Sequence, residues 1–473
     1  MNPMLFAPEL CLLFGSLLLF FLSISENGGV QARKWTLAVV LISLVAAFAA
    51  FGQQGTLFYA AYEVDAFSQL FKLLIIGGLM VVMLFSVDLK GVSDEVRPEY
   101  YLFLLLSTLG LVMLVSCVEL LSFFIALELS SYSLYLLVPM RDDRTGLRGQ
   151  MEAAIKYILF GVVATGVMLF GMSYLFGLTG TTYFSELLPK LHALGTEPAA
   201  LVGIVMVMGG FFYKLGVFPF HFWVPDVYQG SSNETTAFIA SVPKLGAVAM
   251  LIRVTTLVAP GSEMVINLLM VLAVASMFYG NLAALVQKDI KRMLGFSGIA
   301  HAGFVLLGLL TLQESGYATS MYYIFGYVVM NLACFLVICT VSGEGENVLI
   351  EDLSGLHKRS PLLALTLAVG MFALAGIPPF VGFMGKFMLL AGALQQGHLP
   401  LVILAALNTA IAIYYYLSVV RVAYCNDPEE RPEVVVGGLT RMVSIGLMVI
   451  IVAMGVMPTN VLDIATRALQ SIL

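Results

Sequence analysis

The fold of this chain is decided by residues 209–246, which read GGFFYKLGVFPFHFWVPDVYQGSSNETTAFIASVPKLG. The stretch carries a lysine in each of its two flanking apolar segments, Lys214 and Lys244. A lysine at bilayer depth costs roughly 2.5–3.5 kcal/mol on insertion scales, so it marks a functional site by default. Pro219 and Pro225 between the lysines remove backbone donors and interrupt a helix. The pattern predicts a broken membrane helix with a site for moving charge.

The composition is that of a polytopic membrane protein. Of 473 residues, 60% are hydrophobic and 11% charged, whereas a soluble domain has about 25% charged residues. The net charge of -6 is spread over loops without a basic stripe, which argues against nucleic acid as a partner. The five cysteines lack metal-ligand spacing and are interpreted as core residues, so neither a disulfide framework nor a metal site is expected.

The extramembrane segments are short. None is long enough for a soluble domain, so any redox or nucleotide chemistry is expected on another chain. The N-terminal apolar run lacks a basic leading region and is interpreted as the first spanning helix rather than a removed signal. A spanning helix needs about 20 mainly apolar residues. On that rule the sequence predicts about fourteen, over residues 4–24, 35–52, 64–87, 99–117, 119–139, 153–178, 199–219, 235–258, 263–285, 294–312, 317–341, 361–395, 400–424 and 440–457, with a short surface helix over 458–473.

The basic residues of the loops support this count, because Lys and Arg accumulate in short cytoplasmic loops. With the N-terminus outside, the loops assigned outside contain only Lys190. The loops assigned inside contain Arg33, Lys34, Lys90, Arg97, Arg141, Arg144, Arg148, Lys288, Lys291, Arg292, Lys358, Arg359 and Arg431. The alternation predicts that both termini lie on the outer side of the membrane.

The twelfth predicted helix is also broken. It is about 35 residues long, and its centre reads LAGIPPFVGFMGKF, with Pro378 and Pro379. Non-helical backbone at membrane depth is buried in protein or lines a wet cavity, and paired broken helices point to a transport site. The seventh and twelfth helices are five apart and run in opposite directions, as two inverted five-helix repeats would. The predicted division is 1–98 for three N-terminal helices, 99–258 and 259–425 for the repeats, and 426–473 for the last helix and tail.

Several ionisable residues fall inside the predicted helices. Glu128, Lys156, Lys214, Lys244, His301 and Lys386 do so, whereas Lys72, Arg253 and Arg421 are nearer helix ends and are expected to snorkel. Desolvation disfavours a charged lysine, and a carboxylate within about 4–6 Å favours it. A buried Lys beside a Glu can therefore take up or release a proton after a small rearrangement, and histidine suits the links between such sites.

Structural interpretations stand beside this one. A buried Lys–Glu pair also serves to fix helix packing. A histidine such as His301 can also be a satisfied core residue. His221, Trp223 and Asp226 are interpreted as shaping the loop after the helix break rather than as proton carriers.

Three motifs resemble one family. They are KLGVFPFHFWVPDVYQG (214–230), LVQKDIKRMLGFSGIAHAGF (285–304) and KRSPLLALTLAVGMFALAGIPPFVGFMGKFMLL (358–390), and they look like the antiporter-like membrane subunits of respiratory complex I. GFMGKF favours the N-type subunit (subunit 2, ND2-like), because M-type chains usually carry glutamate at the position of Lys386. The segment GSSNETTAF departs from the GAPTPVTAF-like segment of many relatives and leaves Glu234 without a role.

The resemblance implies proton translocation driven by quinone reduction elsewhere in the complex. By position, Glu128 matches the fifth-helix partner of Lys214, and Lys244 matches the connecting lysine. Lys386 matches the exit lysine. Lys156 matches a sixth-helix lysine of N-type chains, Glu99 a fourth-helix carboxylate, and His301 a residue of the central hydrophilic axis.

The same resemblance also concerns partners and location. It implies M-type and K-type neighbours and membrane lipid around the chain, in a bacterial inner membrane. NADH, FMN, iron–sulfur clusters and quinone would be bound by partner subunits, and this chain would bind no cofactor and no metal. A subunit of a multisubunit cation/proton antiporter or of a membrane-bound hydrogenase-type complex remains an alternative. A structural anchor and a free-standing transporter for a small solute are further alternatives.

Overall fold

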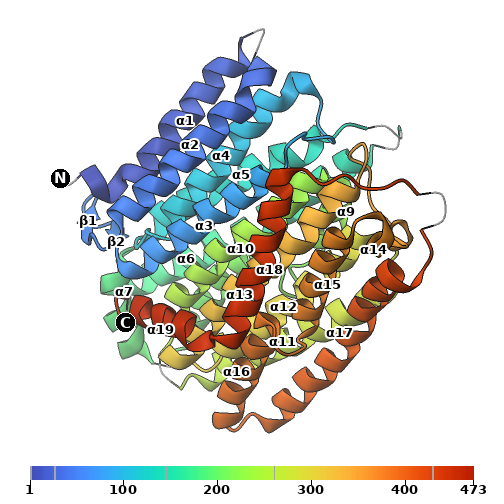
Figure 1. Ribbon diagram of the computed structural model, residues 1–473. Coiled ribbons are helices and arrows are strands. Elements are labelled where there is room, and N and C mark those ends of the chain that lie inside the picture. The colour runs from blue at the N-terminus through green and yellow to red at the C-terminus, as the bar shows by residue number, and fades with distance from the viewer. Residues whose placement is uncertain are drawn as a thin grey trace.

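The computed structural model describes residues 3–25, 28–143, 146, 148–195, 197–259, 261–428 and 431–472. Within them the chain is almost wholly helical (Figure 1). The long helices are α1 Ala7–Ser23, α2 Gly28–Ala50, α3 Ala66–Phe85, α4 Arg97–Leu114, α5 Leu120–Leu137, α6 Gly149–Thr179, α8 Pro198–Leu215, α10 Asn233–Thr255, α11 Glu263–Ala284, α12 Ile290–Leu309, α13 Glu314–Val341, α15 Pro361–Ala375, α16 Val381–Gln395, α17 Leu399–Cys425 and α18 Gly438–Val456.

Shorter elements join these helices. They are the helices α7 Phe184–Leu194, α9 Trp223–Gly230, α14 Leu356–Arg359 and α19 Pro458–Leu469, the 3-10 turns η1 Pro3–Phe6, η2 Asp94–Val96, η3 Val138–Met140 and η4 Ile350–Leu353, and the strands β1 Gly55–Leu57 and β2 Tyr62–Val64. The strands pair antiparallel, with Thr56 opposite Glu63. The predicted all-helical fold is confirmed, and this short hairpin, whose turn Phe58–Ala60 has positive φ, is a local addition to it.

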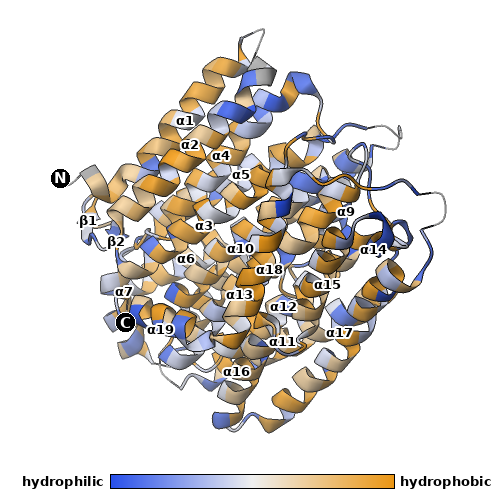
Figure 2. Cartoon of the chain, in the orientation of Figure 1, coloured by the Kyte–Doolittle hydropathy of each residue, from blue (hydrophilic) through white to orange (hydrophobic). Residues whose placement is uncertain are grey.

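Thirteen of the described helices are long and apolar enough to cross a membrane. They match thirteen of the predicted spans, and the shorter apolar pair α15 and α16 lies where the sequence predicts the broken twelfth helix. The predicted surface helix over the tail is α19. Figure 2 shows hydrophobic residues along the middle of the helices and hydrophilic residues gathered at their ends.

Helix α10 lies at the centre of the bundle (Figure 1). All of its residues are buried, and it packs against α3, α8 and α13. A helix that is buried all round belongs inside a large protein, and yet α10 carries three charged residues, Glu234, Lys244 and Arg253. Three charges on the most buried helix make α10 the place to look for function.

The two ends of the bundle differ in their loops. One end, which we call the terminal face, carries the β1–β2 hairpin, α7 and α19; the termini also lie there (Figure 1). The other end, which we call the basic face, carries the loops 86–96, 138–148, 285–289 and 342–360. These contain most of the basic residues used in the topology prediction; Arg144 among them lies outside the described residues.

The two predicted helix breaks have the same local backbone. Helix α8 ends before Gly216, with φ of 83°, and α15 ends before Gly376, with φ of 85°. This left-handed conformation costs glycine nothing. In each break the glycine amide and the next amide both donate to the carbonyl of one phenylalanine, Phe212 or Phe372. Pro219 then lies between α8 and α9, and Pro378 and Pro379 lie between α15 and α16. Both breaks are confirmed.

The polar segment after the first break is shorter than expected. Only Ser231 and Ser232 separate α9 from α10, and 233–236 form the first turn of α10. Ser232 caps that turn, because its Oγ accepts a hydrogen bond from the amide of Thr235 at 3.2 Å. A serine at this position satisfies one of the free amides of a helix start. Glu234 is thereby carried into the protein rather than left in a loop.

Candidate functional site

Glu128 on α5 and Lys214 on α8 form the first group of buried charges. Thr165 on α6 donates a hydrogen bond of 2.8 Å to Oε1 of Glu128. Lys214 Nζ donates to Oγ of Ser131 at 2.9 Å, and Ser131 lies one turn from Glu128 on the same face of α5. The predicted partners are therefore neighbours that act on each other electrostatically, with a hydroxyl as the direct contact of the lysine.

Lys244 on α10 forms the second group. It is 1% exposed, and its Nζ donates to the Tyr327 hydroxyl on α13 at 2.9 Å. The same ammonium lies 4.8 Å from the centroid of the Tyr327 ring, a cation–π contact. Gly298 on α12 makes room for the lysine, since a Cβ there would stand 2.8 Å from Nζ. Lys244 and His301 border one narrow packing gap, which is too small for a water molecule and is also lined by Leu215, the residue after Lys214.

His301 on α12 is held between two tyrosines. Its Nδ1 lies 2.6 Å from the hydroxyl of Tyr323, and its Nε2 lies 3.1 Å from that of Tyr416. The Tyr416 hydroxyl in turn lies 2.6 Å from Oγ of Ser297. Each hydroxyl can donate or accept, so a proton can be handed along the row. The histidine is satisfied, and it is also placed as a link.

Lys386 on α16 lies at the second helix break. Its Nζ donates to the carbonyls of Leu374 at 2.9 Å and Ala375 at 3.2 Å. These are the last two residues of α15, whose terminal carbonyls have no partner within the helix. A cation is favoured there by the helix dipole. The ammonium also lies 5.0 Å from the centroid of the Phe304 ring. The lysine of α16 therefore caps the C-terminal end of α15.

We call these four groups of buried residues together the row. The first group lies on α5 and α8, and the second on α10 and α13. The third lies on α12, α13 and α17, and the fourth on α15 and α16. Lys244 and Lys386 both act electrostatically on His301. The row contains amines, an imidazole, a carboxylate and hydroxyls, all of which exchange protons. Such a row can move a proton across the bundle, provided that water joins groups not in direct contact.

Lys156 lies apart from this row. Its side chain is 37% exposed, and its Nζ contacts carboxylates of Glu152 and Asp226, each at 2.7 Å. Asp226 also pairs with Arg292 at 2.7 Å. The three elements α6, α9 and α12 are thus tied together at the basic face. This geometry agrees with the expectation that Asp226 shapes the segment after the break.

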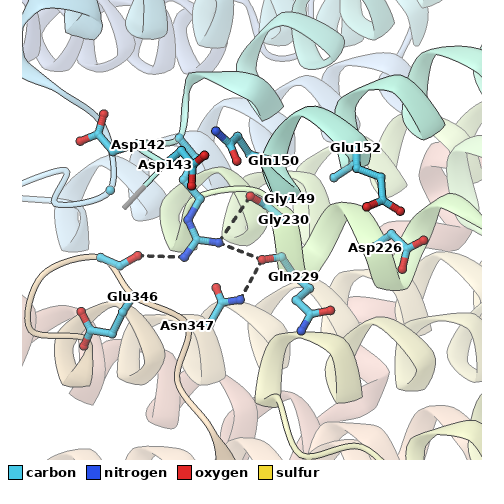
Figure 3. Close-up of a pocket in the computed structure, with 14 residues that line it drawn as sticks. Asp142, Asp143, Gly149, Gln150, Glu152, Asp226, Gln229, Gly230, Glu346 and Asn347 are labelled. Carbon is cyan, nitrogen blue, oxygen red and sulfur yellow. Dashed lines mark hydrogen bonds between the residues drawn. The ribbon is translucent and has the colours of Figure 1, made fainter. Parts of the chain in front are cut away.

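Asp226 and Glu152 line a polar cleft of about 490 Å³ at the basic face (Figure 3). Asn347 donates to the carbonyl of Gln229 across it at 3.0 Å (Figure 3). Glu346 at the rim is partly desolvated, which raises its pKa, but nearby backbone amides outweigh this and hold the pKa below its usual range. Hydrogen bonds within the protein connect the residues that line the cleft. We interpret the cleft as the space left where the loops pack onto the helix ends.

Glu99 and the aromatic segment also lie outside the row. Glu99 lies in the first turn of α4, and its buried Oε2 has no hydrogen-bond partner within the described residues. His221 is buried against the rings of Phe218, Phe222 and Tyr279, and both of its ring nitrogens lack a partner among the described residues. Trp223 donates to the carbonyl of Tyr213 at 2.9 Å.

Two further buried ion pairs correct the expectation that Lys72 and Arg253 snorkel. Lys72 contacts Glu9 at 2.8 Å, with the side chains 3% and 0% exposed. Arg253 contacts Asp65 at 2.6 Å. Snorkelling fails because each cation meets a carboxylate inside the protein. The signal for the first pair was available: Glu9 is an acid within the apolar run 4–24. The partners of the second are distant in sequence.

Among the described residues no group of three or more His, Cys, Asp or Glu side chains could hold a metal ion. Three cysteines are buried, Cys117, Cys334 and Cys339, whereas Cys425 is exposed and so departs from the expectation of a core residue.

Comparison with known proteins gives the family. Residues 117–412 match the model described as "NADH:quinone oxidoreductase/Mrp antiporter, TM". The chain belongs to this family of membrane subunits. It is 53% identical to NADH-quinone oxidoreductase subunit N 2 of Opitutus terrae, over 99% of this chain and 98% of that one. The predicted resemblance, including the N-type choice, is confirmed.

Chains in solved structures are also similar to this one. A chain of respiratory complex I from Thermus thermophilus is similar at 32% identity with a TM-score of 0.84, covering 97% of this chain and 99% of that one. A chain of the Mrp complex from Dietzia sp. DQ12-45-1b has a TM-score of 0.86 at 21% identity, covering 99% of this chain and 97% of that one. The second match shows a shared fold only.

Proposed function

We propose that this chain is the N-type membrane subunit of an NADH:quinone oxidoreductase and that it carries protons across the membrane. The observation that supports this best is Lys244, a buried amine that contacts the Tyr327 hydroxyl and acts electrostatically on His301. A chain with a purely structural role has no need of a desolvated lysine at this place. The names of the relatives support the choice of complex.

In this proposal the proton passes along the four groups of buried residues in turn. Glu128 controls the charge of Lys214, and the proton then passes to Lys244. His301, with Tyr323 and Tyr416, links Lys244 to Lys386, from which the proton leaves. The basic face is the inner side of a bacterial inner membrane, because basic loops accumulate in the cytoplasm, and both termini are then outside. Lys156 and Glu99 remain candidate proton carriers near the inner side, with Lys156 in a surface ion-pair network.

The matching backbones of the two breaks support the division into inverted repeats, 99–258 and 259–425. The segments 1–98 and 426–473 then flank the repeats. M-type and K-type membrane subunits and lipid are the proposed neighbours. NADH, FMN, iron–sulfur clusters and quinone would be held by partner subunits.

The experiment is proton pumping by the whole complex in sealed proteoliposomes, with Lys244→Met in this chain. Lys288→Met is the control, because Lys288 is exposed at the basic face. Pumping and quinone-linked turnover fall on the order of 100-fold in Lys244→Met, the lower end of what a positioned proton-transfer group contributes. The control is unchanged. Wild-type pumping in Lys244→Met contradicts the proposal.

A cation/proton antiporter subunit is the second candidate, because the family model covers both classes. Purification in mild detergent followed by mass spectrometry separates them. Iron–sulfur and flavin subunits in the preparation support the complex I proposal. Recovery with small membrane subunits alone supports the antiporter.

A further inference from the structure

Glu234 is a buried carboxylate that the row of central groups does not use. It lies in the first turn of α10, is 4% exposed, and its Oε2 has no hydrogen-bond partner among the described residues. An unpaired buried carboxylate oxygen is costly, and most buried polar atoms are satisfied. The position therefore calls for a partner that is not part of the chain.

Glu234 faces a cavity of about 200 Å³ at the basic face. The cavity extends from Val435 and Gly437, which are exposed, past Cys339 and Thr340 on α13 to the carboxylate. A water molecule occupies about 30 Å³ of liquid, so the cavity has room for several. Water is therefore the partner that the geometry offers to Oε2.

The charges around Glu234 favour a carboxylate that takes up and releases a proton. The N-terminus of α10 and two lysines stabilise its negative form, while its burial opposes it. The hydroxyl of Ser232 and the backbone amide of Glu234 also lie beside it. Titratable and charged groups on four elements act on Glu234: Tyr100 and Tyr101 on α4, Lys90 in the loop before η2, Lys291 on α12 and Cys339 on α13.

Two more buried polar atoms lie near Lys244 or its partner Tyr327. Glu234 and Lys244 are ten positions apart on α10, roughly 15 Å along the helix. Asn331 donates to the carbonyl of Tyr327, the partner of Lys244, while its Oδ1 has no hydrogen-bond partner in the described part of the chain. The Tyr228 hydroxyl also lacks a partner among the described residues, and, like Lys244 Nζ, it lies within 4 Å of where a Cβ of Gly298 would stand. Buried waters typically bind such unpaired atoms.

We propose that Glu234 collects protons from the basic face and passes them to Lys244 through water held by Asn331 and Tyr228. The carboxylate takes a proton from hydrated protons in the cavity and becomes neutral. It then gives that proton, along the water chain, to the free amine of Lys244, and returns to its charged form. The inference rests on the proposed function, because it supplies the entry to the same row of groups.

The first test is Glu234→Gln in the whole complex, reconstituted in proteoliposomes, with pumping measured against pH at the basic face. Glu351→Gln is the control, because Glu351 is exposed on the same face. A proton collector matters most where protons are scarce. Pumping in Glu234→Gln falls by about tenfold at alkaline pH, less than the ~100-fold of a positioned acid–base group because water still reaches the cavity, and recovers at acid pH.

Glu234→Asp keeps a carboxylate on the same helix turn and restores the wild-type pH profile. A uniform loss at every pH in Glu234→Gln that Glu234→Asp does not rescue overturns the proposal in favour of a packing role. Wild-type pumping at all pH values overturns it as well.

The second test closes the cavity without touching the carboxylate. Gly437 lines the cavity with φ of -62°, and a Cβ there meets nothing within 4 Å. Gly437→Phe therefore fills the mouth without backbone strain. Gly438→Phe is the matched control, since Gly438 is equally open but does not line the cavity. Gly437→Phe lowers pumping at alkaline pH and Gly438→Phe does not; equal behaviour of the two overturns the proposal.

Lys244→Met separates this inference from the proposed function. If Lys244→Met abolishes pumping and Glu234→Gln leaves it intact, protons enter elsewhere and only the inference falls. If Lys244→Met pumps as wild type does, the proposed function falls, and the inference with it.

Discussion

The two helix breaks share a backbone but place their lysines differently. In the first, Lys214 lies in the last turn of α8 and reaches across to Ser131 on α5. In the second, the last turn of α15 holds no lysine, and Lys386 reaches back from α16 to the end carbonyls of α15. The first lysine is tied to a neighbouring helix and the second to its own broken partner.

This difference has a chemical consequence. Lys214 shares its surroundings with Glu128, so its charge depends on a second titratable group. Lys386 is held by carbonyls and the Phe304 ring, which do not titrate. The first break is suited to control of loading, and the second to a fixed site at which the proton is held before it leaves.

Lys386→Met is expected to have the largest effect of any change at the breaks. It removes the only cation that contacts the end of α15 in the described structure, and no carboxylate is present to support a replacement. Pumping by the whole complex falls on the order of 100-fold. Unchanged pumping would remove the second break from the route.

Glu128→Gln is expected to have a smaller effect. Lys214 keeps its contact with Ser131 in this variant and loses the nearby negative charge that favours its charged form. Pumping falls by about tenfold, below the range for loss of the proton carrier itself. A loss as large as that of Lys386→Met would show that the carboxylate is itself a carrier.

Gly216→Ala and Gly376→Ala compare the breaks directly. Both residues have φ above 80°, so each alanine destabilises the protein by about 1–2 kcal/mol. The new Cβ at 376 would lie 3.0 Å from Cδ of Lys386, whereas that at 216 meets Val224. Thermal unfolding should show similar losses in the two variants, and pumping should fall more in Gly376→Ala. The reverse order of pumping would contradict the assignment of Lys386.

Ser131→Ala should have the smallest effect. It removes the hydroxyl that accepts from Lys214, at a cost of about 1 kcal/mol for one hydrogen bond. Pumping is expected to fall by several-fold or less, because water can replace the hydroxyl. Ser133→Ala on the same helix is the control, since its hydroxyl bonds only to the carbonyl of Leu129 in the described structure.

The sequence predicted the breaks and the buried lysines because both depend on local signals. Proline pairs and glycine mark a broken helix wherever it packs, and a lysine within an apolar run is visible without coordinates. The partners of these residues were not predictable in the same way. Tyr323, Tyr416 and Thr165 are distinguished from many similar side chains only by which helices meet.

The sequence also did not predict which of the charged side chains are exposed. Lys156 and Lys214 both lie in apolar helices, but the first is partly exposed and the second is buried. Lys72 is near a helix end by position, and only packing against α1 places Glu9 beside it. Contacts between distant segments decide these cases.

The most direct test of the account is whether the two breaks act in series. Pumping is measured in the whole complex for Glu128→Gln, Tyr323→Phe and the double variant. Glu128→Gln weakens the first break, and Tyr323→Phe removes a hydroxyl beside His301 on the way to the second. In a series the slower step sets the rate, so the double variant pumps about as fast as the slower single variant. If each single variant instead loses only part of the pumping and the double variant loses all of it, the breaks serve parallel routes and the account is contradicted.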